Sequence, residues 1–104
     1  MQQANQTEDF AVPLLYRRLL RYAYYGEIVK NTKAALIKCL DRCNNLTSMS
    51  WGLSRERIYR MINETEHYYP ALIKAIKATP EYNNAAWLLQ YQIESMLDIY
   101  KRLM

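Results

Sequence analysis

The scarcity of glycine and proline is the feature that most restricts the fold of this chain. Its 104 residues include two glycines and three prolines, so the turn residues that many short strands would need are missing. The long segments between them are rich in Leu, Ala, Lys, Arg, Glu and Met, which favour helices. Because 51% of the residues are hydrophobic, a chain of this length can bury a sizeable core. The sequence therefore predicts one all-α domain over residues 1–104.

Apolar spacing divides the chain into four helical segments. We expect a first helix over residues 10–25, after a polar tail of residues 1–9, and a second over residues 32–44. Ser54 is the expected N-cap of the third helix. The pair Thr79-Pro80 is a typical helix start and opens a last helix that runs nearly to the C-terminus.

The first helix is expected to supply one apolar stripe to the seam of a bundle. Asp9 is the expected N-cap and Gly26 the expected stop. The stripe recurs at steps of three and four residues, as one helix face requires. Its members are Val12, Leu15, Leu19 and Tyr22, and Leu20 and Ala23 widen it.

The third and fourth helices each carry an irregular feature. Pro70 lies inside the third and should kink it or divide it near Tyr69. In the segment between the second and third helices, Trp51 and Leu53 are expected to tuck against the bundle. The last helix is apolar on a second side as well, which suggests that another protein covers it. That second side contains Trp87, Leu88, Tyr91 and Ile99.

Few residues suited to catalysis or metal binding are present. Cys39 and Cys43 share a helix face but are unlike a disulfide pair, so we interpret them as small apolar residues. Together with His67, the one histidine, they cannot make a common zinc site. The sequence has neither a glycine-rich phosphate loop nor a nucleophile elbow, and we expect no enzyme activity. No apolar run approaches the length of a transmembrane helix, and the start of the chain lacks a secretory-signal pattern.

The stretch PLLYRRLLRYAYYG at residues 13–26 is the most distinctive part of the sequence. Arg17 and Arg21 share a face, whereas Arg18 projects about 100° away. These arginines are consistent with an ordinary solvated face whose tyrosines sit at the core edge. Guanidinium groups and phenols also grip phosphates or carboxylates. The net charge of +4 favours an acidic partner without choosing between nucleic acid and protein.

Residues Leu15 to Arg21, with the sequence LYRRLLR, resemble the LYR-x-L-L-R signature of the LYR-motif proteins. The segment Ile37–Asn44 is similar to the second helix of that family, with Leu40 near the position where the family usually has a phenylalanine. The resemblance covers residues 10–78. It implies a small three-helix bundle, to which the helix over residues 79–104 would be an addition.

The family is mitochondrial, on the matrix side or associated with the inner membrane, and its members bind mitochondrial acyl carrier protein. The resemblance implies that no cofactor binds directly, because the carrier supplies its own acyl-phosphopantetheine arm. Tyr16 and Arg17 would lie where that arm enters. The residues facing the carrier's acidic side chains would be Arg21, Lys38 and Arg42. The acyl path would be lined by Leu15, Leu19, Leu36 and Leu40.

The resulting hypothesis is a non-catalytic adaptor that binds acylated carrier protein within a respiratory assembly, with complex I accessory subunit as the first guess. A mitoribosome factor or an assembly factor for respiratory complexes, from the same family, is the second guess. A small basic nucleic-acid-binding protein is the alternative from another class, although we do not expect nucleic acid as a partner. The third possible function is that of a purely structural subunit whose arginines contact lipid headgroups or another subunit. The expected partners are mitochondrial acyl carrier protein and other subunits of a large assembly, close to the membrane but without a transmembrane helix.

Overall fold

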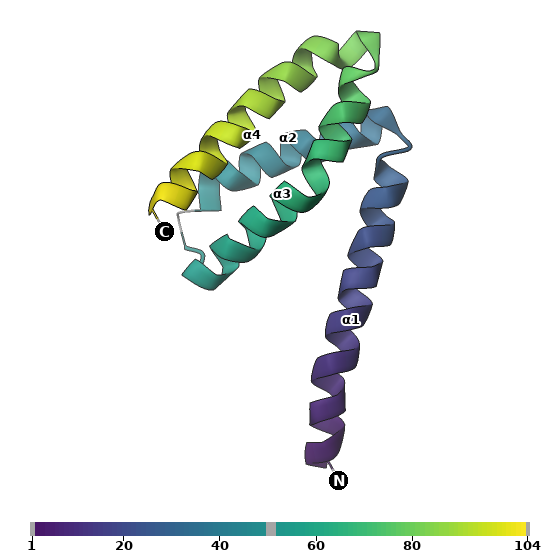
Figure 1. Ribbon diagram of the computed structural model, residues 1–104, viewed down its shortest axis with the longest axis vertical. Helices are drawn as coiled ribbons and strands as arrows, with labels where there is room; N and C mark the ends of the chain where they lie inside the picture. The colour runs from purple at the N-terminus through teal and green to yellow at the C-terminus, as the bar shows by residue number, and fades with distance from the viewer. Residues whose placement is uncertain (1, 50–51, 104) are drawn as a thin grey trace.

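The computed structural model describes the backbone of residues 2–49 and 52–103, and the side chains of residues 14–49 and 52–103. Within these ranges no residue is in a strand, so the all-α prediction is confirmed. Figure 1 shows the four helices. They are α1 (Gln2–Ile28), α2 (Thr32–Ser48), α3 (Arg55–Lys77) and α4 (Asn83–Leu103), with a short 3-10 helix, η2 (Pro80–Tyr82), before α4.

Side-chain caps fix where α2 and α3 begin. Asn31 accepts a hydrogen bond from the backbone N–H of Ala34 at 3.1 Å. Ser54 accepts one from Arg57 at 3.2 Å, as its predicted capping role requires. Each bond satisfies an N–H group that has no partner within the helix. These caps set the register of the faces that α2 and α3 turn toward the core.

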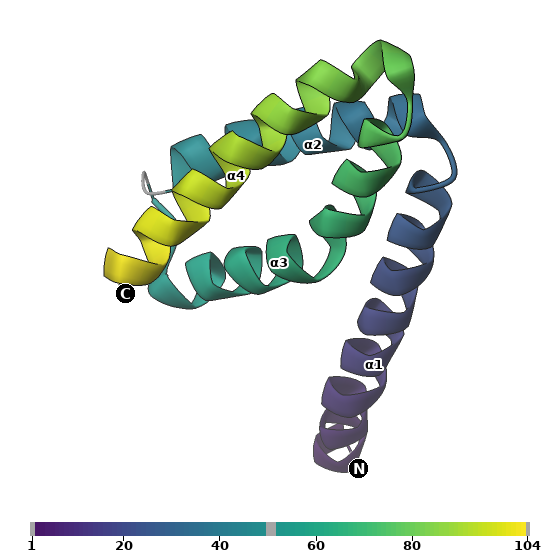
Figure 2. The same ribbon diagram turned by 45° about the horizontal axis from the view of Figure 1, so that its top comes forward.

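Helices α2, α3 and α4 lie side by side and form the bundle (Figures 1 and 2). The helix over residues 79–104, expected to be an addition, is one of these three core helices. Its apolar stripe fills the place next to α2 and α3 that the first helix was expected to take. The buried residues of α4 are Ala86, Leu89, Ile93 and Leu97.

Steps of three and four residues in the sequence predict one buried face of α3, and its members Ile62, Thr65, Tyr69, Leu72, Ile73 and Ile76 are buried. The helix continues without division through Pro70. Figure 2 shows that α3 bends part-way along. Pro70 is exposed, so its missing N–H bond falls on the solvent side, where water can pair with the freed carbonyl. The kink that was predicted occurs, and the alternative of two separate helices does not.

The two cysteines behave as small core residues. Cys39 is fully buried and Cys43 is half-buried, and both thiols are free. Burial raises the pKa of the Cys39 thiol to about 12, with a smaller contribution from Cys43. A protonated, inaccessible thiol is a poor nucleophile. Leu53 packs against the core as expected, whereas Trp51 lies outside the described residues.

Helix α1 lies largely outside the bundle (Figure 1). Leu15, Leu19 and Tyr22 are 60%, 67% and 70% exposed, so the predicted seam is wrong for these three; Val12 lies outside the described side chains. The helix begins at Gln2 and continues past Gly26, so Asp9 is not its cap. An interior glycine costs a helix only about 1 kcal/mol, which explains why Gly26 does not stop it.

Candidate binding site along helix α1

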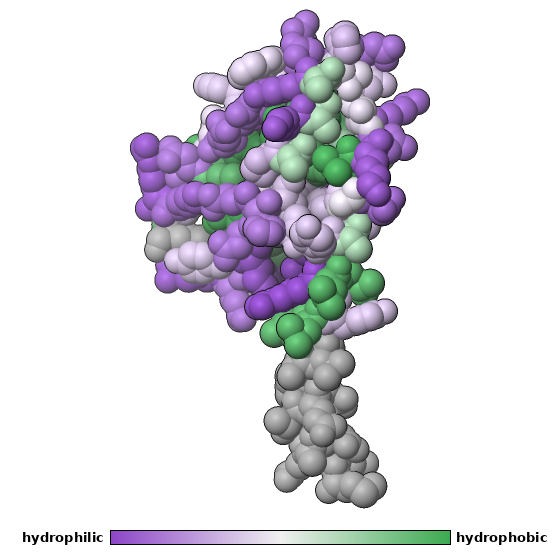
Figure 3. Space-filling model, turned by 45° about the vertical axis from the view of Figure 1, so that its right-hand side comes forward, coloured by the Kyte–Doolittle hydropathy of each residue, from purple (hydrophilic) through white to green (hydrophobic). Residues whose placement is uncertain are grey.

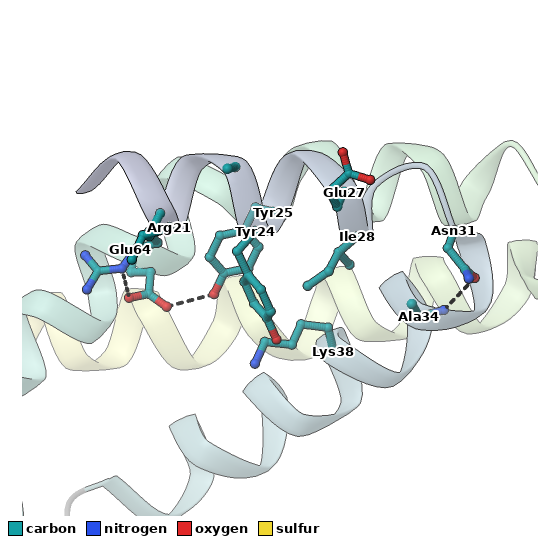
Figure 4. Close-up of a pocket in the computed structure, with 11 residues that line it drawn as sticks. Arg21, Tyr24, Tyr25, Glu27, Ile28, Asn31, Ala34, Lys38 and Glu64 are labelled. Atoms are coloured by element: carbon teal, nitrogen blue, oxygen red, sulfur yellow. Dashed lines mark hydrogen bonds and ion pairs between the residues drawn. The ribbon is translucent and has the colours of Figure 1, made fainter. Parts of the chain in front are cut away.

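An open groove of about 890 Å³ separates the C-terminal half of α1 from the start of α2 (Figure 4). Most of its wall is apolar. The apolar contacts come from one side of α1 and from the first turns of α2, which the short Val29–Asn31 connection turns back toward α1. Its apolar lining consists of Leu20, Ala23, Tyr24, Ile28 and Ala34. Such a groove suits a ligand with an extended hydrocarbon part.

Two cations and two carboxylates lie along the same groove. Lys38 reaches across it from α2, with its ammonium 5.3 Å from the centre of the Tyr24 ring (Figure 4). Arg21 lies toward the N-terminal end of the groove and forms an ion pair with Glu64 at 3.2 Å. Glu27 lies on the rim and pairs with Lys30. The ammonium of Lys38 is 3.9 Å from Asp41, its nearest carboxylate, so this cation is only loosely engaged.

A polar network joins α1, α2 and α3 at the base of the groove. The Tyr25 hydroxyl donates a hydrogen bond to Glu64 Oε1 at 2.7 Å and lies 3.1 Å from the Tyr69 hydroxyl. Arg42 reaches the same carboxylate oxygen from α2 at 2.5 Å, and its guanidinium lies 4.8 Å from the Tyr69 ring. The Tyr25 ring also stacks on Tyr68 at 4.5 Å between centroids. These contacts fasten the end of α1 to the bundle.

The electrostatics of this network favour a charged Glu64. Burial disfavours the carboxylate, but the hydrogen bond from Tyr25 and the charges of Arg42 and Arg21 outweigh it, so the pKa of Glu64 lies below its usual value of 4.5. Burial, and hydrogen bonds to Tyr69 and Glu64, raise the pKa of Tyr25. Tyr25 therefore stays protonated and acts as a donor.

A lowered carboxyl pKa predicts a pH-dependent stability. Glu64 makes its full contribution to the free energy of unfolding above pH 4.5, which is its pKa in the unfolded chain. That contribution is lost as the pH falls through its lower pKa in the folded state. We expect the free energy of unfolding of the native chain to fall more steeply below pH 4.5 than that of a Glu64→Gln variant. Denaturant titrations at a series of pH values measure the two slopes. Glu94→Gln, at an exposed position, serves as the control, and equal slopes for native chain and Glu64→Gln would contradict the assignment.

A second groove, of about 430 Å³, lies between α1 and α3. Four of the nine residues that line it are arginines, and its one acid, Glu64, is already paired with Arg42 and Arg21. Among the described side chains, no carboxylate forms an ion pair with Arg17, Arg18 or Arg60. His67 also faces this groove. The four arginines are Arg17, Arg18, Arg21 and Arg60.

The cationic residues expected at a carrier site fall into two groups. Arg17 and Arg21 line the groove between α1 and α3, and Arg21 also lines the first groove together with Lys38. Tyr16 is 61% exposed and lines neither groove. Arg42 is only 6% exposed and engaged with Glu64. In this structure Arg42 holds the bundle together and does not face outward.

The leucines expected to line an acyl path are not the ones that line the first groove. Leu15 and Leu19 are exposed on the far side of α1, Leu40 is exposed on α2, and Leu36 is half-buried against the core. The lining residues Leu20, Tyr24 and Ile28 recur at steps of four. That spacing is visible in the sequence, but it belongs to a face different from the stripe through Leu15 and Leu19.

Neither a protein-family model, nor a curated protein, nor a solved structure matches this chain. In the described residues, no helix combines the length and apolar character needed to cross a membrane.

Proposed function

We propose that this protein is a mitochondrial adaptor of the LYR-motif type that binds acylated acyl carrier protein. An accessory subunit of respiratory complex I is the first assignment, and a mitoribosome or assembly factor of the same family is the second. The observation that carries the proposal is the open, mainly apolar groove along α1 next to the Leu15–Arg21 motif. An apolar slot with cations beside it suits a fatty chain that ends in an anionic arm.

In this proposal each part of the groove has a separate task. The acyl chain lies along Leu20, Tyr24 and Ile28, where it leaves water. The phosphate of the carrier's arm meets Lys38 or Arg21 near the rim, since charged donors form the stronger hydrogen bonds to phosphate. Arg17 faces the acidic helix of the carrier. Arg42 has no contact with the carrier here, because it is buried, and Leu20 takes the role first given to Leu15 and Leu19.

Binding of carrier protein to two variants tests the proposal. Lys38→Gln should weaken binding by about 1.5–3 kcal/mol, the worth of a hydrogen bond to a charged group. Ala34→Phe fills the groove and should abolish the preference for acylated carrier over carrier that has only its phosphopantetheine arm. Titration calorimetry with the two forms of the carrier measures both effects.

Lys33→Gln is the matched control, because Lys33 is exposed on α2 and absent from the groove lining. If Lys33→Gln and Lys38→Gln weaken binding equally, the cation acts only through net charge and the site is wrong. If neither form of the carrier binds, the function itself is wrong.

The arginine groove between α1 and α3 favours one other function, the binding of nucleic acid. Arg60 joins the three arginines of α1 there, which the sequence did not indicate. RNA binding that weakens steeply with salt and needs Arg60 would support this alternative over carrier binding.

A further inference from the structure

Residues 14–22 of α1 are exposed and are all leucines, tyrosines or arginines. Between residues 14 and 22, six of the nine side chains are large and apolar, each at least 50% exposed, and the other three are arginines. Figure 3 shows hydrophobic side chains gathered on this part of the helix. Contiguous apolar surface of this kind marks an interaction site. The apolar six are Leu14, Leu15, Tyr16, Leu19, Leu20 and Tyr22.

The three arginines of this stretch face α3, whereas Leu15 and Leu19 face away from it. Arg17, Arg18 and Arg21 fall within an arc of about 100° at 100° per residue, and all three line the groove against α3. Leu15 and Leu19, four residues apart, project from the opposite side. We call Leu15, Tyr16 and Leu19 the outer face of α1. An ordinary surface helix does the reverse, with its apolar side against the core.

The charges beside the outer face restrict what can cover it. Arg18, three residues from Leu15, lies at the edge of this face, and a cation there favours a negatively charged partner. The face is also a convex ridge on one helix, which suits insertion into a soft surface. A tyrosine at the boundary between water and an apolar layer keeps its hydroxyl in water while its ring is buried. Arginine stems extend along apolar surface and leave their charge at the level of phosphates.

We propose that the outer face of α1 binds the surface of an anionic lipid bilayer. Leu15 and Leu19 enter the boundary between headgroups and acyl chains, and Arg18, at the flank of the polar arc next to Leu15, contacts lipid phosphates. The helix lies in the membrane plane, as basic amphipathic helices do. Leu15, Tyr16 and Leu19 line neither groove of α1, so the proposal does not depend on carrier binding.

Co-sedimentation of the full chain with vesicles tests this inference. We expect binding to vesicles of phosphatidylcholine mixed with phosphatidylglycerol, and little binding to phosphatidylcholine alone. A Leu15→Gln/Leu19→Gln variant should lower the partition coefficient at least about tenfold, because two leucines no longer leave water. Arg18→Gln should lower it about fivefold, the effect of one cation near an anionic surface.

Two variants with equally exposed substitutions elsewhere serve as controls. Leu88→Gln/Ile99→Gln changes residues of α4 that are 60% and 56% exposed, and Lys33→Gln removes a cation from α2. Both should bind vesicles like the native chain. The inference is overturned if the native chain does not sediment with anionic vesicles, or if the α4 variant loses as much binding as the α1 variant. It is also overturned if the chain dimerises through Leu15 and Leu19 without lipid.

Discussion

A chain that ends at Ala78 will not form a cooperative fold. Truncation removes Leu89, Ile93 and Leu97 from the core, and each is at most 8% exposed. Burying a side chain of this kind contributes about 1.5–3 kcal/mol. It also uncovers Ile73 and Ile76 on α3, which are buried in the full chain. Since a whole domain is stable by only about 5–15 kcal/mol, the loss exceeds what the remaining helices can supply.

Circular dichroism during heating and denaturant titration measure this result. A shortened chain should melt gradually, whereas the full chain should show one sharp transition. Point variants provide the comparison within the full chain. Ile93→Ala should cost about 2–5 kcal/mol, whereas Leu19→Ala, on exposed α1, should change stability by no more than about 0.5 kcal/mol. A sharp transition in the shortened chain would show that residues 10–78 fold alone, as the family resemblance implied.

Replacing Glu64 with glutamine will destabilise the chain by about 3–5 kcal/mol, the typical cost of leaving a buried charge without its partner. Arg42 is 6% exposed, and its one ion pair among the described residues is with Glu64 at 2.5 Å. Its remaining hydrogen bonds go to Tyr25 at 3.2 Å, to Thr65 at 3.5 Å and to the Met61 sulfur, which are neutral groups. A neutral residue at position 64 therefore leaves the guanidinium charge uncompensated. Denaturant titration of the free energy of unfolding measures the cost.

The opposite substitution should be much milder. In Arg42→Met, the Glu64 side chain remains 21% exposed and keeps its ion pair with Arg21 at 3.2 Å, so its charge is still solvated and paired. A double variant, Glu64→Gln with Arg42→Met, should regain most of the stability lost by Glu64→Gln alone. The three measurements form a double-mutant cycle. Equal losses in both single variants, with no recovery in the double, would show that the pair acts through packing and not charge.

The sequence predicted the candidate site only in part. It proposed Arg17, Arg21 and Lys38 as cations of a binding site from the family resemblance, and each of them lines a groove along α1. It placed Arg42 outside and Leu15 and Leu19 inside, and the structure has the reverse. A helix with apolar residues on more than one side does not define which side faces the core, so its periodicity could not choose between the two faces. Arg60 joins the arginine groove because α3 lies beside α1. A local sequence pattern holds no information on how two distant helices pack.

The sequence by itself determined the class of fold, the cap at Ser54, the buried stripe of α3 and the kink at Pro70. These are local properties, since caps, proline geometry and a single strong stripe act within a few turns of one helix. Only the tertiary structure decided which three helices make the bundle. Helix α4 offers a stripe of Ala86, Leu89, Ile93 and Leu97 that buries against α2 and α3, whereas Leu15 and Leu19 of α1 stay exposed. Which helix fills the last place in a core depends on how faces from distant segments fit together, and α1 is therefore left free to bind something else.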